Sequence, residues 1–196
     1  MLAELDNGLA VFFGDRHVGT LAETPKGLVA FQYDDEWLRS GFSINPYSLP
    51  LSDRVFVPEW QPFEGLFGAF NDSLPDGWGA LLLDRMLAEK GLDPADVSPL
   101  QRLSIVGSRG RGALRYVPES GFAAGTWPHD LDQLAALCSS ILDEKPVDDL
   151  DAVYAAGGSS GGARPKAYVE DDGSWLVKFP SRIDPPDSGK STMRKC

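Results

Sequence analysis

Residues 157–179 combine a glycine-rich stretch with a following lysine, a pairing that can hold the phosphate groups of a nucleotide. Glycines reach positive φ and let the backbone approach a ligand closely, so their N–H groups can donate to phosphate oxygens. Lys178, near the end of the stretch, can supply the cation that phosphate binding needs. The candidate phosphate-binding residues are Gly158, Ser159, Ser160, Gly161, Gly162 and Lys178.

The same composition is also typical of a flexible linker, and a lysine on a strand is commonly a solvated edge residue. Arg164-Pro165-Lys166, directly after the glycines, favours phosphate binding, because a linker needs neither two cations nor a φ-fixing proline. A Walker A loop is not formed by Gly189-Lys190-Ser191, because Asp184 stands where that motif has its first glycine. The linker and the phosphate-binding interpretations both stay open on composition alone.

A short hairpin is expected to position Lys178. Residues 167–170 and 175–179 are strand-like, and Asp171-Asp172-Gly173 between them is a hairpin-turn signal. Alternation along the second strand places Lys178 and Leu176 on one face, opposite the face of Trp175, Val177 and Phe179. Lys178 is therefore expected to point away from the aromatic side.

The segment Gly157–Pro180 resembles the start of the kinase core in HipA-like serine/threonine kinases, the toxins of bacterial toxin–antitoxin pairs. Its Gly-Gly-Ala-Arg-Pro-Lys-Ala and Trp-Leu-Val-Lys-Phe-Pro runs carry this resemblance. Three earlier stretches resemble the small N-terminal subdomain that precedes that core, namely residues 48–52, 65–79 and 103–114. The pieces keep the family's order from about Phe12 to Pro180, which is more specific than any single motif.

The resemblance implies roles for individual residues. Lys178 corresponds to the lysine that contacts ATP phosphates, and Ser159 or Ser160 lies near the serine that such kinases autophosphorylate. ATP and magnesium are the cofactors of the full-length family, and none is assigned to this chain. The implied partner is a HipB-like DNA-binding antitoxin or a kinase core.

The sequence departs from the family after Lys178. A kinase needs a catalytic aspartate and magnesium ligands, which the family carries in a helical lobe after the lysine strand. Only residues 181–196 follow here, with two prolines and no helical apolar pattern, so no catalytic residue and no metal ligand is assigned. We expect a truncated chain that is inactive alone; the alternative is a non-catalytic regulatory or binding module that packs on a kinase core or antitoxin.

The expected fold class is α+β. A small antiparallel sheet or partial barrel with helices forms a HipA-like N-terminal subdomain over residues 1–120, and the truncated start of a kinase-like core, the first hairpin of its N-lobe, follows over residues 121–196. The strands are expected at residues 9–13, 16–21 and 28–33, with a further run near 55–57 and a two-residue turn at Gly14-Asp15.

Three longer helices are expected from apolar spacing and capping residues. The first opens at Pro75-Asp76, is closed by Gly91, and places Trp78, Leu81, Leu82 and Arg85 or Met86 at helical spacing. The second spans residues 99–106 after the cap Ser98, and the third spans 131–142 after the cap Asp130. Asp72 and Asp76 are interpreted as capping or turn residues rather than as paired catalytic carboxylates.

The charge balance bounds the function. The 196 residues contain 18 Lys and Arg against 29 Asp and Glu, a net charge of −11, which argues against direct binding to nucleic acid or to a membrane surface. No run approaches the roughly 18 apolar residues of a membrane span. Two cysteines do not make a disulfide framework, and the two histidines lack partners at zinc-ligand spacing. A cytoplasmic location is expected.

Overall fold

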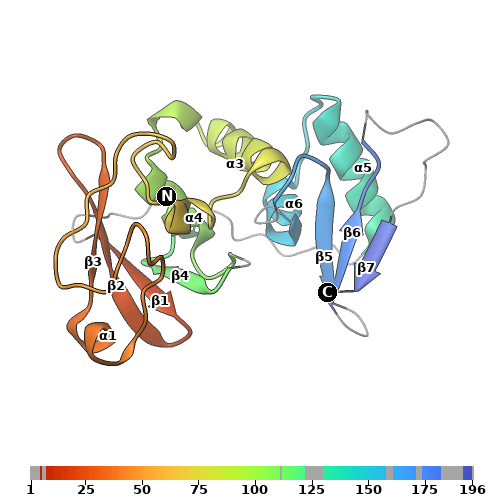
Figure 1. Cartoon of the computed structure of the whole chain (residues 1–196). Coiled ribbons are helices and arrows are strands. Elements are labelled where there is room, and N and C mark those ends of the chain that lie inside the picture. The colour runs from red at the N-terminus through yellow and green to blue at the C-terminus, as the bar shows by residue number, and fades with distance from the viewer. Residues whose placement is uncertain are drawn as a thin grey trace. The chain divides into compact units, whose positions relative to one another are not determined.

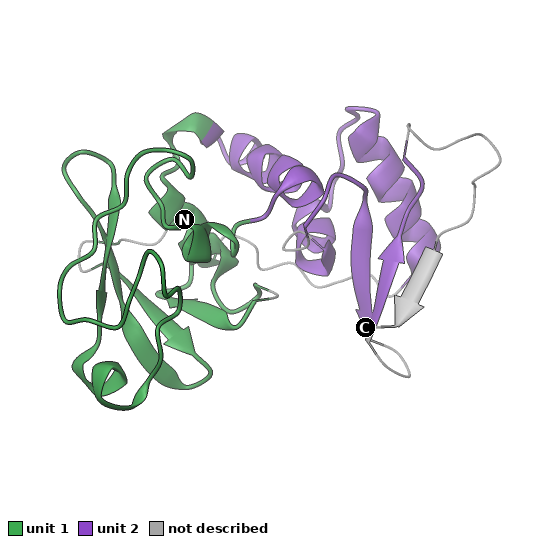
Figure 2. Ribbon diagram, in the orientation of Figure 1, with its two compact units in different colours: residues 1–74, 95–122 green, residues 75–94, 123–196 purple. Residues whose placement is uncertain are grey.

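The computed structural model describes residues 5, 8–110, 112–121, 130–157, 161–170, 174–181 and 192–195. The chain divides into two compact units (Figure 2). The first unit combines residues 1–74 with 95–122, and the second combines residues 75–94 with 123–196. The division expected from the sequence differs in one segment, because residues 75–94 cluster with the second unit.

Four antiparallel strands form the sheet of the first unit, in the order β3-β2-β1-β4 (Figure 1). Their bounds are Leu9–Phe13 for β1, Arg16–Glu23 for β2, Val29–Tyr33 for β3 and Leu114–Val117 for β4. Phe13 pairs with Arg16, and Gly14 has a φ of 59°, so the expected two-residue turn between β1 and β2 is confirmed. The α+β class with a small antiparallel sheet is also confirmed.

Helices and loops cover the apolar side chains of this sheet. The helices of the first unit are α1 (Asp35–Ser40), α2 (Gly68–Asn71) and α4 (Pro99–Val106). A short 3₁₀ helix at Pro94–Asp96 contains residue 95, at which the chain re-enters this unit. One side-chain cluster joins the strands to all three α-helices through Trp37, Phe70 and Leu103, each at most 1% exposed. This cluster is the hydrophobic core of the first unit.

Residues 55–57 do not form the further strand that the sequence suggests. They contact β3 through one isolated bridge, in which the amides and carbonyls of Phe31 and Phe56 exchange hydrogen bonds of 2.8 and 2.9 Å. Pro58 follows directly, and its missing N–H cannot continue a ladder. The run is therefore a single bridge on β3.

The predicted helix caps at Ser98 and Asp130 are confirmed. The Ser98 hydroxyl accepts a hydrogen bond from the Gln101 amide at 3.3 Å, and the Gln101 side chain accepts one from the Ser98 amide at 3.0 Å. Asp130 accepts a hydrogen bond from the Asp132 amide at 2.9 Å at the start of α5 (Leu131–Leu142). Each cap satisfies an amide that a helix start leaves without an intrahelical partner.

The second unit packs helices against a three-stranded antiparallel sheet of order β5-β6-β7. Its strands are β5 (Lys166–Glu170), β6 (Ser174–Lys178) and β7 (Thr192–Lys195), and the expected β5–β6 hairpin is confirmed. Helix α6 (Leu150–Gly157) contacts β5, α5 and α3 (Gly77–Glu89). The sequence predicts no element at β7, because its short polar run lacks the apolar alternation of a strand.

Helix α3 belongs to the second unit because its buried face packs on α6. Trp78, Leu82, Leu83 and Met86 are at most 1% exposed, whereas Leu81 is 36% exposed. The buried face of α3 therefore includes Leu83, which the predicted spacing leaves out, and leaves Leu81 partly exposed. None of the helices among the described residues is long and apolar enough to cross a membrane.

Candidate functional site

The end of α6 lies directly against the start of β5. A side chain at Gly157 would place its Cβ 2.0 Å from the carbonyl oxygen of Lys166, so only glycine permits this approach. The contact of Gly157 with Lys166 therefore holds the last residue of α6 beside the first residue of β5.

Lys166 closes the last part of this stretch, residues 161–166, which we name the glycine turn. Its ammonium group donates to the carbonyl oxygens of Gly161 and Gly162, the latter at 3.1 Å. Gly162 has a φ of 95°, a conformation that residues with side chains rarely adopt. The Phe179 amide donates to the Pro165 carbonyl at 2.9 Å, which ties the turn to the end of β6.

Two lysines occupy one face of the β5–β6 hairpin. Lys166 and Lys178 are directly paired in the antiparallel register, so their side chains leave the same face. Burial lowers the pKa of Lys166, which is 5% exposed, and the charge of Lys178 lowers it further, whereas the Asp76 carboxylate acts in the opposite direction. Lys178 is partly exposed, and the ion pairs found among the described residues do not include it.

The predicted alternation of β6 is confirmed from Val177 to Phe179, whereas Trp175 and Leu176 are both partly exposed. Val177 and Phe179 are 0% and 2% exposed, whereas Lys178 between them remains partly open to solvent. The lysine thus lies on the face opposite the buried apolar residues.

Asp76 holds the glycine turn from the side of α3. It occupies the residue before the helix, but its side chain makes no bond to the amides of α3, so the predicted capping role is wrong for the carboxylate. Asp76 Oδ1 instead accepts a hydrogen bond of 2.5 Å from the Gly162 amide, and the Trp78 amide donates to the Gly162 carbonyl at 3.1 Å. A Cβ on Gly77 would lie 2.7 Å from the Gly162 carbonyl carbon, so the turn packs closely on the helix start.

Among the predicted phosphate-binding residues, Gly161 and Gly162 accept hydrogen bonds from Lys166, and Lys178 pairs with Lys166 across the hairpin. Gly158, Ser159 and Ser160 lie outside the described residues. Sequence reasoning did not include Lys166 in the site, although the antiparallel register of β5 and β6 places it opposite Lys178. It also missed the contact of Asp76 with the turn, because no sequence pattern connects a residue before one helix to a loop 86 positions later.

This arrangement suits anion binding better than covalent chemistry. Backbone amides and two ammonium groups are the donors that phosphate oxygens prefer. Across the described part of the chain, no group of three or more His, Cys, Asp or Glu side chains is placed to hold a metal ion. Phosphate binding at the glycine turn stays a prediction.

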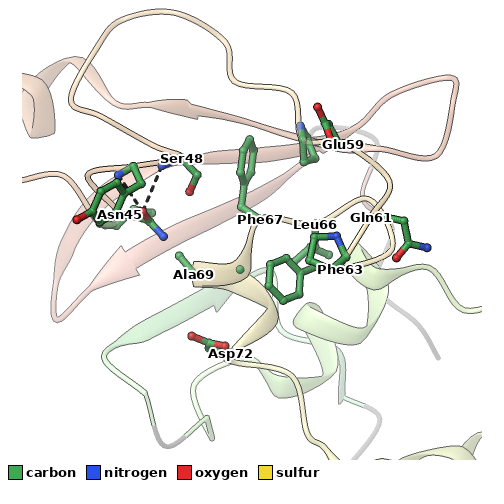
Figure 3. Close-up of a pocket in the computed structure, with 14 residues that line it drawn as sticks. Asn45, Ser48, Glu59, Gln61, Phe63, Leu66, Phe67, Ala69 and Asp72 are labelled. Atoms are coloured by element: carbon green, nitrogen blue, oxygen red, sulfur yellow. Dashed lines mark hydrogen bonds between the residues drawn. The ribbon is translucent and has the colours of Figure 1, made fainter.

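A separate groove of about 620 Å³ lies in the first unit (Figure 3). Its lining is mostly apolar and aromatic, with the carboxylates of Glu59 and Asp72 and without a lysine or arginine. The Asn45 side chain accepts hydrogen bonds from the amides of Tyr47 and Ser48 at 3.0 and 3.2 Å, which shapes one end of the groove. Sequence reasoning missed this groove, because its walls combine loop residues without regular spacing with the start of α2.

Comparison with known proteins identifies the family of the chain. Residues 9–117 match the model of the family described as "HipA N-terminal domain". The chain belongs to the HipA N-terminal domain family. The match spans β1 to β4, so the four-stranded sheet of the first unit lies within the matched residues, and the HipA-like resemblance seen in the sequence is confirmed.

Among solved structures, the chain is similar to one from Shewanella oneidensis MR-1, whose title describes HipA, HipB and their operator DNA in complex. The identity is 18% and the TM-score is 0.47, over 89% of this chain and 41% of that chain. This HipA-family chain thus spans about two fifths of the length of the solved chain. No curated protein matches the sequence.

Proposed function

We propose that this chain is the N-terminal part of a HipA-like, ATP-dependent serine/threonine protein kinase of a toxin–antitoxin system. In this proposal the glycine turn and Lys178 bind the phosphate groups of ATP, together with Gly158, Ser159 and Ser160. The observation that carries the proposal is the placement of Lys178 beside a glycine turn already closed by Lys166. Membership of the HipA N-terminal domain family supports the kinase lineage.

The partly exposed Lys178 has the properties that a phosphate-binding lysine needs. It projects from a strand rather than from a loop, so its stem is held by the β5–β6 ladder. The neighbouring Lys166 adds positive charge but directs its ammonium to two carbonyl oxygens. Lys178 is therefore the lysine of this pair whose charge we assign to a ligand.

We assign nucleotide binding, and not phosphoryl transfer, to these 196 residues. Transfer needs a base for the substrate hydroxyl and ligands for magnesium, and we place neither on the residues of this chain. Ser159 and Ser160 are the candidate autophosphorylation sites, with the base contributed by a catalytic lobe. The expected property of the isolated polypeptide is ATP binding without turnover.

Lys178→Met tests this proposal, since methionine keeps the length of the stem and removes the charge. Binding of a fluorescent ATP analogue should weaken about tenfold or more, which corresponds to about 1.4 kcal/mol for one charge-assisted contact. Lys26→Met, an exposed lysine of the first unit, is the matched control and should bind as the parent does. Equal affinity in Lys178→Met and the parent would contradict the proposal.

A second candidate function is a non-catalytic module that binds a HipB-like antitoxin, and the groove of the first unit favours it. The groove lies within the family-matched residues and carries two carboxylates without a basic side chain. A DNA-binding antitoxin is basic on its nucleic-acid-binding surface, so an acidic groove complements its charge. Phe63→Ser, in the groove wall, should weaken antitoxin binding, whereas Val55→Ser, an exposed residue outside the lining, should not.

A further inference from the structure

The amide of Gly162 already has an anionic partner. Asp76 Oδ1 accepts its hydrogen bond at 2.5 Å, and a Cβ built on Gly161 would lie 3.4 Å from the same oxygen. The carboxylate thus rests against the backbone of the glycine turn. A phosphate oxygen approaching the Gly162 amide would have to take the place of this carboxylate oxygen.

The charge of Asp76 also acts on Lys166. Its electrostatic effect raises the pKa of Lys166 against the larger lowering effects of burial and of Lys178. Asp76 is the carboxylate that faces Lys166, so it supplies negative charge to a site with two ammonium groups. A bound phosphate group would supply the same charge in its place.

Helix α3 does not depend on the Asp76 carboxylate for the hydrogen bonds of its first turn. The side chain makes no cap bond to α3, and the Trp78 amide is satisfied by the Gly162 carbonyl. Releasing the carboxylate from Gly162 therefore leaves the hydrogen bond between α3 and the turn in place. The Asp76–Gly162 bond can open without unfolding the helix start.

We propose that the Asp76 carboxylate is an internal anion of the glycine turn, because it binds the Gly162 amide to which a phosphate oxygen would otherwise bind. Phosphate binding and the Asp76–Gly162 hydrogen bond therefore exclude each other. Rotation of one carboxylate side chain would open the site and restore its donor. This inference rests on the proposed function, because it concerns the same phosphate-binding turn. Asp76 is a positioning residue in this scheme, since it acts through the amide of Gly162.

Two variants remove the charge in different ways. Asp76→Asn keeps the shape of the side chain, and Asp76→Ser keeps a residue favoured before a helix, so failure of one to fold leaves the other informative. Asp53→Asn is the matched control, being an exposed aspartate of the first unit that lies outside the groove lining. The probes are tripolyphosphate and ATP, titrated by calorimetry into the 196-residue protein.

The two Asp76 variants should bind tripolyphosphate about tenfold tighter than the parent, because a like charge at the phosphate position is gone. Asp53→Asn should bind as the parent does. In the parent, saturating tripolyphosphate should shift the Gly162 amide resonance to the position that it has in the ligand-bound Asp76→Asn variant. That common resonance position would show that the carboxylate has left the amide.

Unchanged or weaker binding by both folded Asp76 variants would overturn the inference. If Lys178→Met still loses ATP binding in that case, the proposed function stands and only the role of Asp76 fails. If the Asp76 variants gain affinity while Lys178→Met has no effect, the internal anion stands and the role of Lys178 fails. Absence of binding by every variant contradicts both.

Discussion

Lys166 lies directly opposite Lys178 across the β5–β6 hairpin, so two ammonium groups project from the same face of the hairpin. Like charges directly opposite each other on neighbouring strands are destabilising. The pair persists because Lys166, although 5% exposed, donates to two carbonyl oxygens of the glycine turn. The hairpin thus carries positive charge that an anion can neutralise.

The Lys166 environment predicts a rise in stability at alkaline pH. Burial and the charge of Lys178 lower the pKa of Lys166 below its ordinary value of 10.5. Between the folded and unfolded pKa values the unfolded chain binds more protons, so the free energy of unfolding rises as pH increases towards 10.5. Urea unfolding of the parent and of Lys166→Met, measured at several pH values, should show this rise in their difference.

Lys178→Met provides the control for this pH dependence. Removing the neighbouring charge should bring the pKa of Lys166 closer to 10.5 and narrow the pH window. A difference between the parent and Lys166→Met that stays constant from pH 7 to the alkaline range would show that Lys166 is not perturbed.

Gly157→Ala should destabilise the second unit by about 2 kcal/mol or more, the cost of overpacking a close contact. Its Cβ would lie 2.0 Å from the Lys166 carbonyl oxygen, so α6 or β5 must move. Gly112→Ala is the control, since a Cβ there meets no atom within 4 Å. Equal urea midpoints for the two variants would contradict the close packing of α6 on β5.

Tyr116→Phe should lower the free energy of unfolding by about 1 kcal/mol. The Tyr116 hydroxyl is buried and donates to the Ser73 hydroxyl at 2.7 Å, and burial raises the pKa of Tyr116 so that the proton is retained. Tyr47→Phe changes the same atoms on a side chain that is 98% exposed and should have little effect. Equal losses in the two variants would show that the buried bond adds no net stability.

A fragment of residues 1–122 should expose the apolar face of α3. Trp78, Leu82, Leu83 and Met86 are buried in the second unit, which this fragment lacks apart from α3 itself. The fragment should bind the dye ANS strongly, and replacing residues 75–94 with a glycine–serine linker should abolish that binding. Equal dye binding by the two fragments would contradict the assignment of α3 to the second unit.

Local signals predicted the elements of this fold well. Ser98 and Asp130 lie at the expected helix starts, and Gly14 lies in the expected turn, because caps and tight turns depend on residues within four positions of each other. Residues 55–57 form a single bridge rather than a strand because their pairing depends on tertiary neighbours, and the exposure of Leu81 depends on tertiary neighbours too. Apolar spacing does not say which of two adjacent leucines faces a helix elsewhere in the chain.

The residues of the candidate site also differ in whether local sequence signals or tertiary contacts determine their positions. Lys178 was predicted from its strand and its alternation, and the antiparallel register of β5 and β6 adds Lys166. Asp76 was assigned to its own helix because sequence distance favours local partners, whereas the structure pairs it with Gly162. The groove of the first unit could not be predicted, because its walls combine loop residues with the start of α2.

Residues 75–94 belong to the second unit but lie between two segments of the first, and this order has an evolutionary consequence. The polypeptide passes from one unit to the other after residue 74, returns after residue 94, and passes again after residue 122. A single recombination breakpoint therefore cannot exchange either unit intact between two genes. The two units are expected to be inherited as a pair. Substitutions in α3 at its contact with α6 should be accompanied by substitutions in α6.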